Sequence, residues 1–168
     1  MIKIGILGDI GSGKSYIAKS FGYPVFNADK EVADLYRDNK KIFKELNKVL
    51  PKYIKSSPIK KKEITIAILA SNNNLKKIIR IVHFETRKKM KIFLKKNKNK
   101  KIVILDIPLL LENKINNKND ILVFVDSKKS EVEKRLKKRL NFNRKLINMF
   151  KKIQFSSSYK KKKSNFII

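Results

Sequence analysis

The chain has 168 residues, of which 43 are lysine or arginine and 14 are aspartate or glutamate, so its formal net charge is +29 at pH 7. This length predicts one domain, or one domain with a small insert, that can bury a hydrophobic core. The absence of cysteine excludes a disulfide scaffold and a thiolate zinc site.

The first predicted element is a short apolar strand at residues 2–7, and a loop of the pattern G-x-x-x-x-G-K-[ST] follows it directly. The residues after this loop, 16–21, can continue as a helix. A strand, this loop and a helix in that order direct backbone N–H groups and a helix N-terminus at one anionic phosphate. We therefore predict a nucleoside triphosphate site, and we disfavour a glycine-rich turn without a ligand. Its predicted binding residues are Gly8, Asp9, Ile10, Gly11, Ser12, Gly13, Lys14, Ser15 and Tyr16.

Two residues of the loop have separate chemical roles. Lys14 is expected to reach the β- and γ-phosphates and to act in catalysis. The Ser15 hydroxyl is expected to hold Mg²⁺.

Strands and helices alternate along the rest of the chain. Helical patterns follow the second strand, fill most of residues 40–100 with a long amphipathic helix through 75–94, and return at 131–139 and 146–153. The predicted strands lie at residues 2–7, 24–26, 102–107, 121–125 and 166–168. This alternation favours a doubly wound parallel sheet with an all-helical insert.

Three segments carry recognisable motifs, namely the glycine-rich loop, Asn27-Ala28-Asp29 after the second strand and the P-L-L-x-E segment at 108–112. Together these segments resemble motifs of the dephospho-CoA kinase family. The resemblance covers nearly all of the chain, because Arg135, Arg139, Gln154 and the ending 164–168 also match at compatible spacings.

The resemblance implies a P-loop kinase fold, which is an α/β fold with a parallel five-stranded sheet flanked by helices. It also implies a helical substrate-binding insert and a lid. We expect the core at residues 1–57, 101–136 and 156–168, the CoA-binding insert at about 58–100 and the lid at about 137–155.

The activity implied by the resemblance is transfer of the ATP γ-phosphoryl group to the ribose 3′-hydroxyl of dephospho-CoA, the last step of coenzyme A synthesis. ATP and Mg²⁺ are the expected cofactors, and ATP and dephospho-CoA the expected partners. We expect a cytoplasmic monomer or weak oligomer. A strand that begins at Ile2 leaves no room for a signal peptide, and the apolar run at 102–111 is too short to cross a membrane.

Asp29 is the expected catalytic base. Phosphoryl transfer uses a carboxylate near the attacking hydroxyl, and Asp29 follows the carboxyl end of a strand, where ligands bind in open α/β sheets. The alternative is an N-cap for the next helix. Asn27 takes the first acidic position of the family's D-A-D motif and cannot act as a base, which leaves the role of that position open.

Three arginines within ten residues are expected to act on phosphates. Arg139, which we assign to catalysis and ATP binding, and Arg144 match the family's lid, where a cation can close over the nucleotide. Arg135 lies one helical turn before Arg139 and could join them. The alternative is a solvated charged face.

Asp106 ends the third predicted strand, where a carboxylate would support Mg²⁺ through water or would end the strand in a turn. The resemblance assigns substrate contact to His83, Pro108, Leu109, Leu110, Glu112, Gln154 and Asp29. Packing is the alternative for His83 and for residues 108–110. Helix capping is the alternative for Glu112, and a surface role is the alternative for Gln154.

Three other functions stay open. One is another small-molecule P-loop kinase, although nucleoside monophosphate kinases carry arginines where this chain has Asp29. Another is an inactive paralogue, which Asn27 and the lack of the family's adenine-contacting loop after the last strand keep possible.

The third is a non-catalytic NTP- or nucleic-acid-binding protein that uses the excess of lysine. Only six of the basic residues are arginine, the side chain that makes bidentate contacts with bases, and the aromatic residues are scattered. Lysine is spread along the chain with abundant isoleucine and asparagine, which favours the codon bias of an AT-rich genome. We therefore expect no specific nucleic-acid partner, although a basic cleft would attract anionic substrates.

Overall fold

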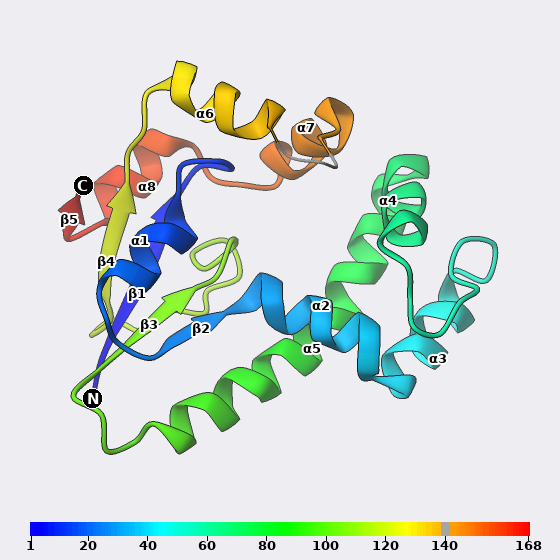
Figure 1. Cartoon of the computed structure of the whole chain (residues 1–168), viewed down its shortest axis with the longest axis horizontal. Helices are drawn as coiled ribbons and strands as arrows, with labels where there is room; N and C mark the ends of the chain where they lie inside the picture. The colour runs from blue at the N-terminus through cyan, green and yellow to red at the C-terminus, as the bar shows by residue number, and fades with distance from the viewer. Residues whose placement is uncertain (139–141) are drawn as a thin grey trace. The chain divides into compact units, whose positions relative to one another are not determined.

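The computed structural model describes residues 1–138 and 142–168. Within these residues five strands form one fully parallel sheet in the order β2-β3-β1-β4-β5 (Figure 1). The predicted parallel five-stranded sheet is therefore confirmed. The strands are β1 (Ile2–Gly8), β2 (Val25–Asn27), β3 (Ile102–Asp106), β4 (Ile121–Val125) and β5 (Phe166–Ile167).

The part of the chain that the structure describes contains eight helices. The 25-residue helix at Asn72–Lys96 confirms the predicted long amphipathic helix. The helices are α1 (Lys14–Ser20), α2 (Ala28–Asp38), α3 (Lys40–Val49), α4 (Lys61–Ala70), α5 (Asn72–Lys96), α6 (Lys129–Lys137), α7 (Arg144–Lys152) and α8 (Ser157–Lys163). No described helix combines the length and the apolar character needed to cross a membrane.

The chain divides into two compact units. We call Met1–Asn27 with Phe93–Ile168 the sheet unit, and Ala28–Ile92 the helical unit. The boundaries proposed above for the core, the CoA-binding insert and the lid are functional boundaries and stay predictions.

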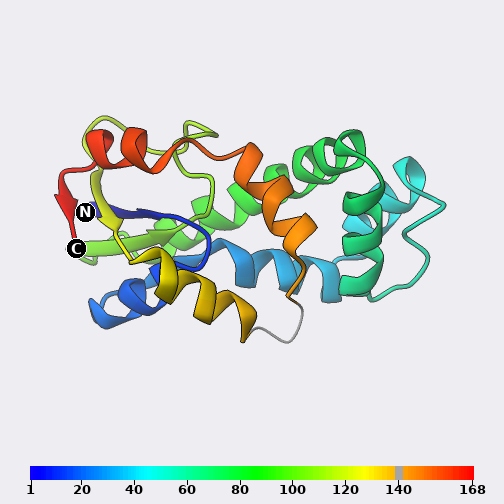
Figure 2. The same cartoon turned by 90° about the horizontal axis from the view of Figure 1, so that it is seen from above.

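The sheet unit is layered around its central strands. Ile6 on β1, Ile104 on β3 and Val123 on β4 form a buried cluster with Ala18 of α1. Continuous apolar runs form these strands because helices cover both faces of a parallel sheet. Figure 2 shows α1 and α6 on one side of the sheet and α8 on the other.

Gly5 on β1 leaves room for the segment that follows β3. A Cβ atom at position 5 would lie 2.5 Å from Leu110 Cδ2 and 3.0 Å from Leu122 Cδ2. Leu110 is 1% exposed, so this segment is fixed to the sheet by close packing.

The helical unit has an apolar core of its own. One carboxylate, Glu63 of α4, organises the loop between α3 and α4 by accepting hydrogen bonds from Lys55 N, Ser56 N and Lys60 N at 3.2, 3.1 and 3.4 Å. The Ser56 hydroxyl also donates to it, at 2.9 Å. The fully or nearly buried side chains in the core of the helical unit include Leu35, Ile42, Leu46, Ile54, Ala67, Leu75 and Ile78.

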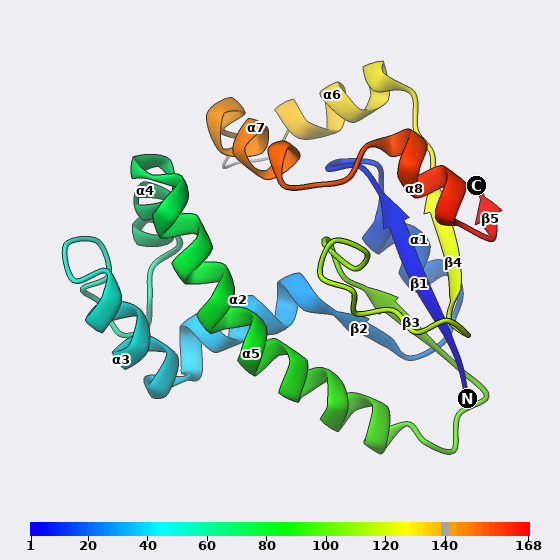
Figure 3. The same ribbon diagram turned by 180° about the vertical axis from the view of Figure 1, so that it is seen from behind.

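Helix α8 was not predicted. Its N-cap is Ser156, whose hydroxyl accepts a hydrogen bond from Tyr159 N at 3.2 Å. Seen from behind, in Figure 3, α8 lies beside β1 and β4. Residues 160–163 are all lysine, so no apolar periodicity indicated a helix in this segment.

Candidate active site

The loop between β1 and α1 needs glycine at positions 8 and 11. Both have positive φ angles, of 149° and 89°. A Cβ atom at Gly8 would lie 2.5 Å from Ser12 Oγ and 2.9 Å from the Val125 carbonyl oxygen. At Gly11 it would lie 2.9 Å from Leu136 Cγ of α6. The loop is therefore held tightly between its own turn, β4 and α6.

The ammonium of Lys14 lies over this loop. Its Nζ donates hydrogen bonds to the carbonyl oxygens of Gly8 and Asp9 at 3.1 and 2.8 Å. Gly13 is the N-cap of α1, and its carbonyl accepts from Tyr16 N and Ile17 N. This arrangement places a cation and the first turn of a helix at one loop, which favours binding of an anion.

Helix α6 fixes the loop from a second direction. The Ser12 carbonyl oxygen accepts hydrogen bonds from Ser127 Oγ at 2.8 Å and from Arg135 Nη1 at 3.2 Å. Arg135 Nη1 also donates to Ser127 Oγ at 3.4 Å. The structure thus brings Arg135 to the loop, whereas the contribution of Ser127 was not predicted.

Helix α8 fixes the loop from a third direction. The Asp9 carboxylate accepts hydrogen bonds from Ser157 Oγ at 2.5 Å and from Lys160 Nζ at 2.9 Å. Partial burial acts to raise the pKa of Asp9. The hydrogen bonds from Ser157 and Lys160, with the charges of Lys160 and Lys14, outweigh it and hold the pKa below its ordinary value.

Two polar residues meet at the carboxyl ends of β2 and β3. Asn27 and Asp106 are register partners, and Asn27 Nδ2 donates to Asp106 Oδ2 at 2.6 Å. Asp106 is 3% exposed, so Asn27 satisfies one oxygen of a buried carboxylate. Because the strands are parallel, these residues share the sheet edge from which the loop after β1 emerges.

The donors predicted for Mg²⁺ are a hydroxyl and a carboxylate. Ser15, the second residue of α1, is exposed, and Asp106 ends β3. The described residues contain no group of three or more His, Cys, Asp or Glu side chains that could hold a metal ion. This oxygen donor set fits Mg²⁺, which takes few protein ligands and completes its octahedron with waters and substrate phosphates.

The P-L-L-x-E segment and the residues after α7 contact one another. Gln154 Nε2 donates to the Pro108 carbonyl oxygen at 3.4 Å, and Phe155 N donates to Glu112 Oε1 at 2.8 Å. The Leu109 carbonyl accepts from Asn113 N at 3.1 Å, which closes a turn within the segment. Four residues predicted from the family, Pro108, Leu109, Glu112 and Gln154, therefore lie in one small cluster, with the buried Leu110 beneath.

The other predicted residues have different locations. Asp29 is the exposed second residue of α2, so it is not the N-cap of that helix. His83 lies on α5 in the helical unit, where burial first and the charge of Arg87 second lower its pKa. Arg144 begins α7 and is exposed, and Arg139 lies outside the described residues.

Sequence reasoning also missed Ser157 and Lys160. Lys160 is 3% exposed, and its burial depends on a partner 151 positions earlier in the chain, which no local pattern reveals. The serine N-cap ahead of the lysines was the signal that a helix begins there.

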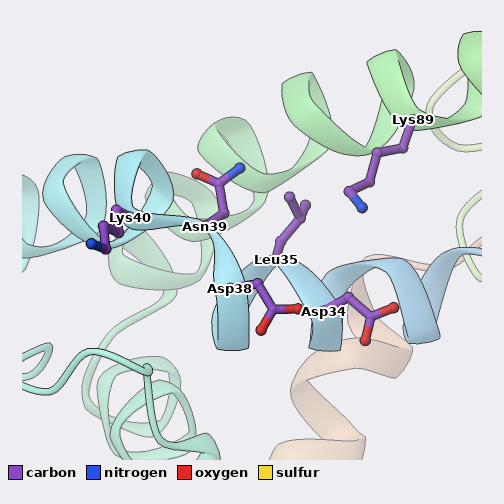
Figure 4. A pocket seen from close by; sticks show the side chains of 6 residues that line it. All are labelled: Asp34, Leu35, Asp38, Asn39, Lys40 and Lys89. Atoms are coloured by element: carbon purple, nitrogen blue, oxygen red, sulfur yellow. The ribbon is translucent and has the colours of Figure 1, made fainter.

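A pocket opens in the helical unit, on α2, α5 and the start of α3 (Figure 4). None of the predicted site residues lines it, and its two carboxylates pair with the neighbouring Arg37. Its lining residues are Asp34, Leu35, Asp38, Asn39, Lys40 and Lys89.

Comparison with known proteins gives a consistent result. The model of the dephospho-CoA kinase family matches residues 2–168. Dephospho-CoA kinase of Wolbachia pipientis wMel is 34% identical over 170 residues, which cover 98% of this chain and 87% of that protein. The Rhizobium meliloti (strain 1021) dephospho-CoA kinase is 31% identical over 173 residues, or 100% of this chain and 88% of that one.

Solved structures share the fold. A crystal structure of a Thermus thermophilus protein has a TM-score of 0.75 and 27% identity, covering 99% of this chain and 86% of that chain. Dephospho-CoA kinase from Campylobacter jejuni has a TM-score of 0.63 and 22% identity, with the same coverage of 99% and 86%.

Proposed function

Because this chain belongs to the dephospho-CoA kinase family and is an ATP-dependent phosphotransferase of coenzyme A synthesis, we propose that Lys14, Asp29 and Asp106, which ends β3, take part in transfer of the γ-phosphoryl group. The family match favours dephospho-CoA kinase activity over that of another small-molecule kinase and over a non-catalytic NTP- or nucleic-acid-binding protein. The observation that supports our assignment of roles best is the loop of residues 8–15, with the Lys14 ammonium lying over its carbonyl oxygens.

The phosphates of ATP would bind at this loop. Lys14 would exchange its carbonyl partners for the β- and γ-phosphate oxygens and would stabilise the charge that develops on them during transfer. Ser15 and Asp106 would hold Mg²⁺, which supplies charge neutralisation when bound. Arg144, and Arg139 outside the described residues, are proposed to add positive charge at the phosphates.

In the reaction we propose, Asp29 accepts the proton of the ribose 3′-hydroxyl. The 3′-oxygen forms a bond to the γ-phosphorus of ATP while the bond from that phosphorus to the β,γ-bridging oxygen breaks. ADP leaves and coenzyme A is the product. Asp29 suits this role because it is an exposed carboxylate two residues beyond the end of β2.

For His83, contact with dephospho-CoA is proposed from the family alone. For Pro108, Leu109, Glu112 and Gln154 the hydrogen-bonded cluster adds support, because a segment held in one conformation can present a fixed surface to a substrate. We assign Leu110 to holding that segment against β1. We also propose a cytoplasmic monomer or weak oligomer, which sedimentation velocity and cell fractionation would test.

The test of Asp29 is formation of coenzyme A from ATP and dephospho-CoA with Mg²⁺, measured for the parent and for Asp29→Asn. Loss of a general base lowers kcat by about 10²–10⁴-fold, and we expect ATP binding to persist in the variant. Asp38→Asn is the matched control, because Asp38 is an exposed aspartate on the same helix that pairs with Arg37. An Asp29→Asn variant with the parent's kcat would contradict the assignment.

A further inference from the structure

Lys160 is a buried cation that the proposed reaction does not use. Its side chain is 3% exposed, and its ammonium lies 2.9 Å from Asp9 Oδ1 and 3.4 Å from the Gly8 carbonyl oxygen. Lysine is almost never fully buried unless it is paired with an opposite charge. Both of its contacts are residues of the phosphate-binding loop.

Asp9 places a negative charge inside a loop that must accept a polyanion. A carboxylate and a triphosphate a few ångströms apart repel each other, and the repulsion is stronger where water is partly excluded. Both carboxylate oxygens are occupied, because Lys160 donates to Oδ1 and Ser157 to Oδ2. Their donors come from one helix, α8, and one of them carries a compensating positive charge.

The position of Lys160 is set by structure on both sides of it. Ser156 caps the start of α8. After the helix, Asn165 N donates to the Leu122 carbonyl at 2.8 Å, and Asn165 Oδ1 accepts from Leu122 N at 2.8 Å. Helix α8 is therefore anchored to β4, and the ammonium is preorganised at the loop.

We propose that Lys160 is a positioning residue for ATP, which neutralises Asp9 and, with Ser157, holds its carboxylate against α8 so that the loop accepts the phosphates. This inference rests on ATP binding at the loop, and not on the role of Asp29. Removal of the positive charge would leave Asp9 uncompensated in the loop, and removal of both charges would restore the net charge that the Asp9–Lys160 pair has in the parent.

The experiment measures the Kd of ATP with Mg²⁺ by calorimetry, and the KM for each substrate, for the parent, Lys160→Met, Asp9→Asn and the double variant. Lys160→Met is expected to raise the Kd and the KM for ATP by roughly tenfold or more, with a smaller change in kcat and in the KM for dephospho-CoA. Asp9→Asn is expected to bind ATP more tightly than the parent, because the unpaired ammonium then faces the phosphates. The double variant is expected to regain most of the lost affinity.

Lys161→Met is the matched control. Lys161 is the next residue on α8, but its ammonium lies 2.6 Å from the carboxylate of Asp126, which is not a residue of the loop at 8–15. Its replacement is expected to leave the Kd for ATP within twofold of the parent value. If Lys160→Met does not fold, Asp9→Asn still decides, and the ATP affinity of the double variant is then compared with that of the parent.

Three results would overturn the proposal. They are unchanged ATP affinity in folded Lys160→Met, weaker ATP binding in Asp9→Asn, and a double variant that binds as weakly as Lys160→Met. The last two would assign the α8 contacts to loop structure alone. Failure of the kinase assignment has a different signature, because the parent would then bind ATP without forming coenzyme A.

Discussion

Single residues in this site depend on compensation by their neighbours. Asp106 is a buried carboxylate that Asn27 satisfies with one hydrogen bond, and Asp9 is a loop carboxylate that Lys160 and Ser157 satisfy from α8. In both pairs the partners are far apart in sequence. Replacement of one partner therefore leaves the other without its hydrogen bond or opposite charge, which changes stability or ligand binding.

The pair at the ends of β2 and β3 gives a prediction for stability. Asn27→Asp restores the family's acidic residue but puts a second carboxylate in contact with the buried carboxylate of Asp106. We expect the free energy of unfolding of the metal-free protein to fall by about 1–3 kcal/mol at neutral pH, because a hydrogen bond is lost and like charges repel. Urea unfolding of the whole chain, without and with Mg²⁺, measures this.

The control for that measurement is Asn99→Asp, which makes the same chemical change in an exposed turn. It is expected to change the stability by less than about 0.5 kcal/mol. Added Mg²⁺ is expected to recover part of the loss in Asn27→Asp, since the extra carboxylate is an additional oxygen ligand. Equal stability of Asn27→Asp and the parent in the absence of metal would contradict this account of the pair.

At the level of elements, apolar runs made the sheet predictable and charge concealed one helix. The strands at residues 102–107 and 121–125 could be predicted because a parallel strand covered on both faces must be apolar throughout. The sequence K-K-K-K at 160–163 has no apolar periodicity, although one of its lysines is buried. Helix α8 exists because the sheet edge and Asp9 supply its partners, and sequence periodicity contains no such information.

In the candidate site, the local motifs could be predicted from sequence, whereas the long-range contacts could not. Residues 8–15 and 108–112 carry motifs whose spacing is local, so both segments were identified from sequence, although the turn at 109–113 was not. The links from Arg135 to Ser12 and from Lys160 to Asp9 join positions 123 and 151 apart, and they follow only from the packing of α6 and α8 on the sheet.

In the helical unit, Glu63 gives a prediction for the loop between α3 and α4. Burial acts to raise the pKa of Glu63, but hydrogen bonds from Ser56 and from the backbone N–H groups of Lys55, Lys60 and Ser56 outweigh it and lower the pKa. Glu63→Ala removes the carboxylate that accepts all of these hydrogen bonds. We expect it to lower the free energy of unfolding by about 1 kcal/mol at pH 7, the usual effect of losing a helix cap.

The pH dependence of this effect has a definite sign. A carboxylate whose pKa is lower in the folded state stabilises the fold above its unfolded pKa of about 4.5, and the contribution disappears as the pH falls through the folded value. The stability difference between the parent and Glu63→Ala should therefore shrink below pH 4.5. Glu45→Ala, a half-exposed surface glutamate 3.8 Å from Lys41, is the control and should show less than about 0.5 kcal/mol at any pH. A Glu63 effect no larger than that of Glu45 would contradict the capping role.

In the whole molecule, the net charge of +29 includes a few cations held at the candidate site and many lysines elsewhere. Among the described residues, three cations are held at the loop of residues 8–15 by defined contacts, namely Lys14, Arg135 and Lys160, and we propose that Arg139 and Arg144 add to them. The remaining lysines contribute a general field that raises the local concentration of anionic substrates, an effect that salt screens. We propose that specificity comes from these cations and from the substrate residues expected from the family.

Phosphoryl transfer to dephospho-CoA can be tested directly by ³¹P NMR analysis of the product formed from ATP and dephospho-CoA by the full chain with Mg²⁺. We expect a new phosphomonoester on the ribose 3′-oxygen, formed in equal amount with ADP and absent in Lys14→Met. Binding of ATP by a folded chain that yields no 3′-phosphorylated product would contradict the central claim that this chain transfers the γ-phosphoryl group to dephospho-CoA.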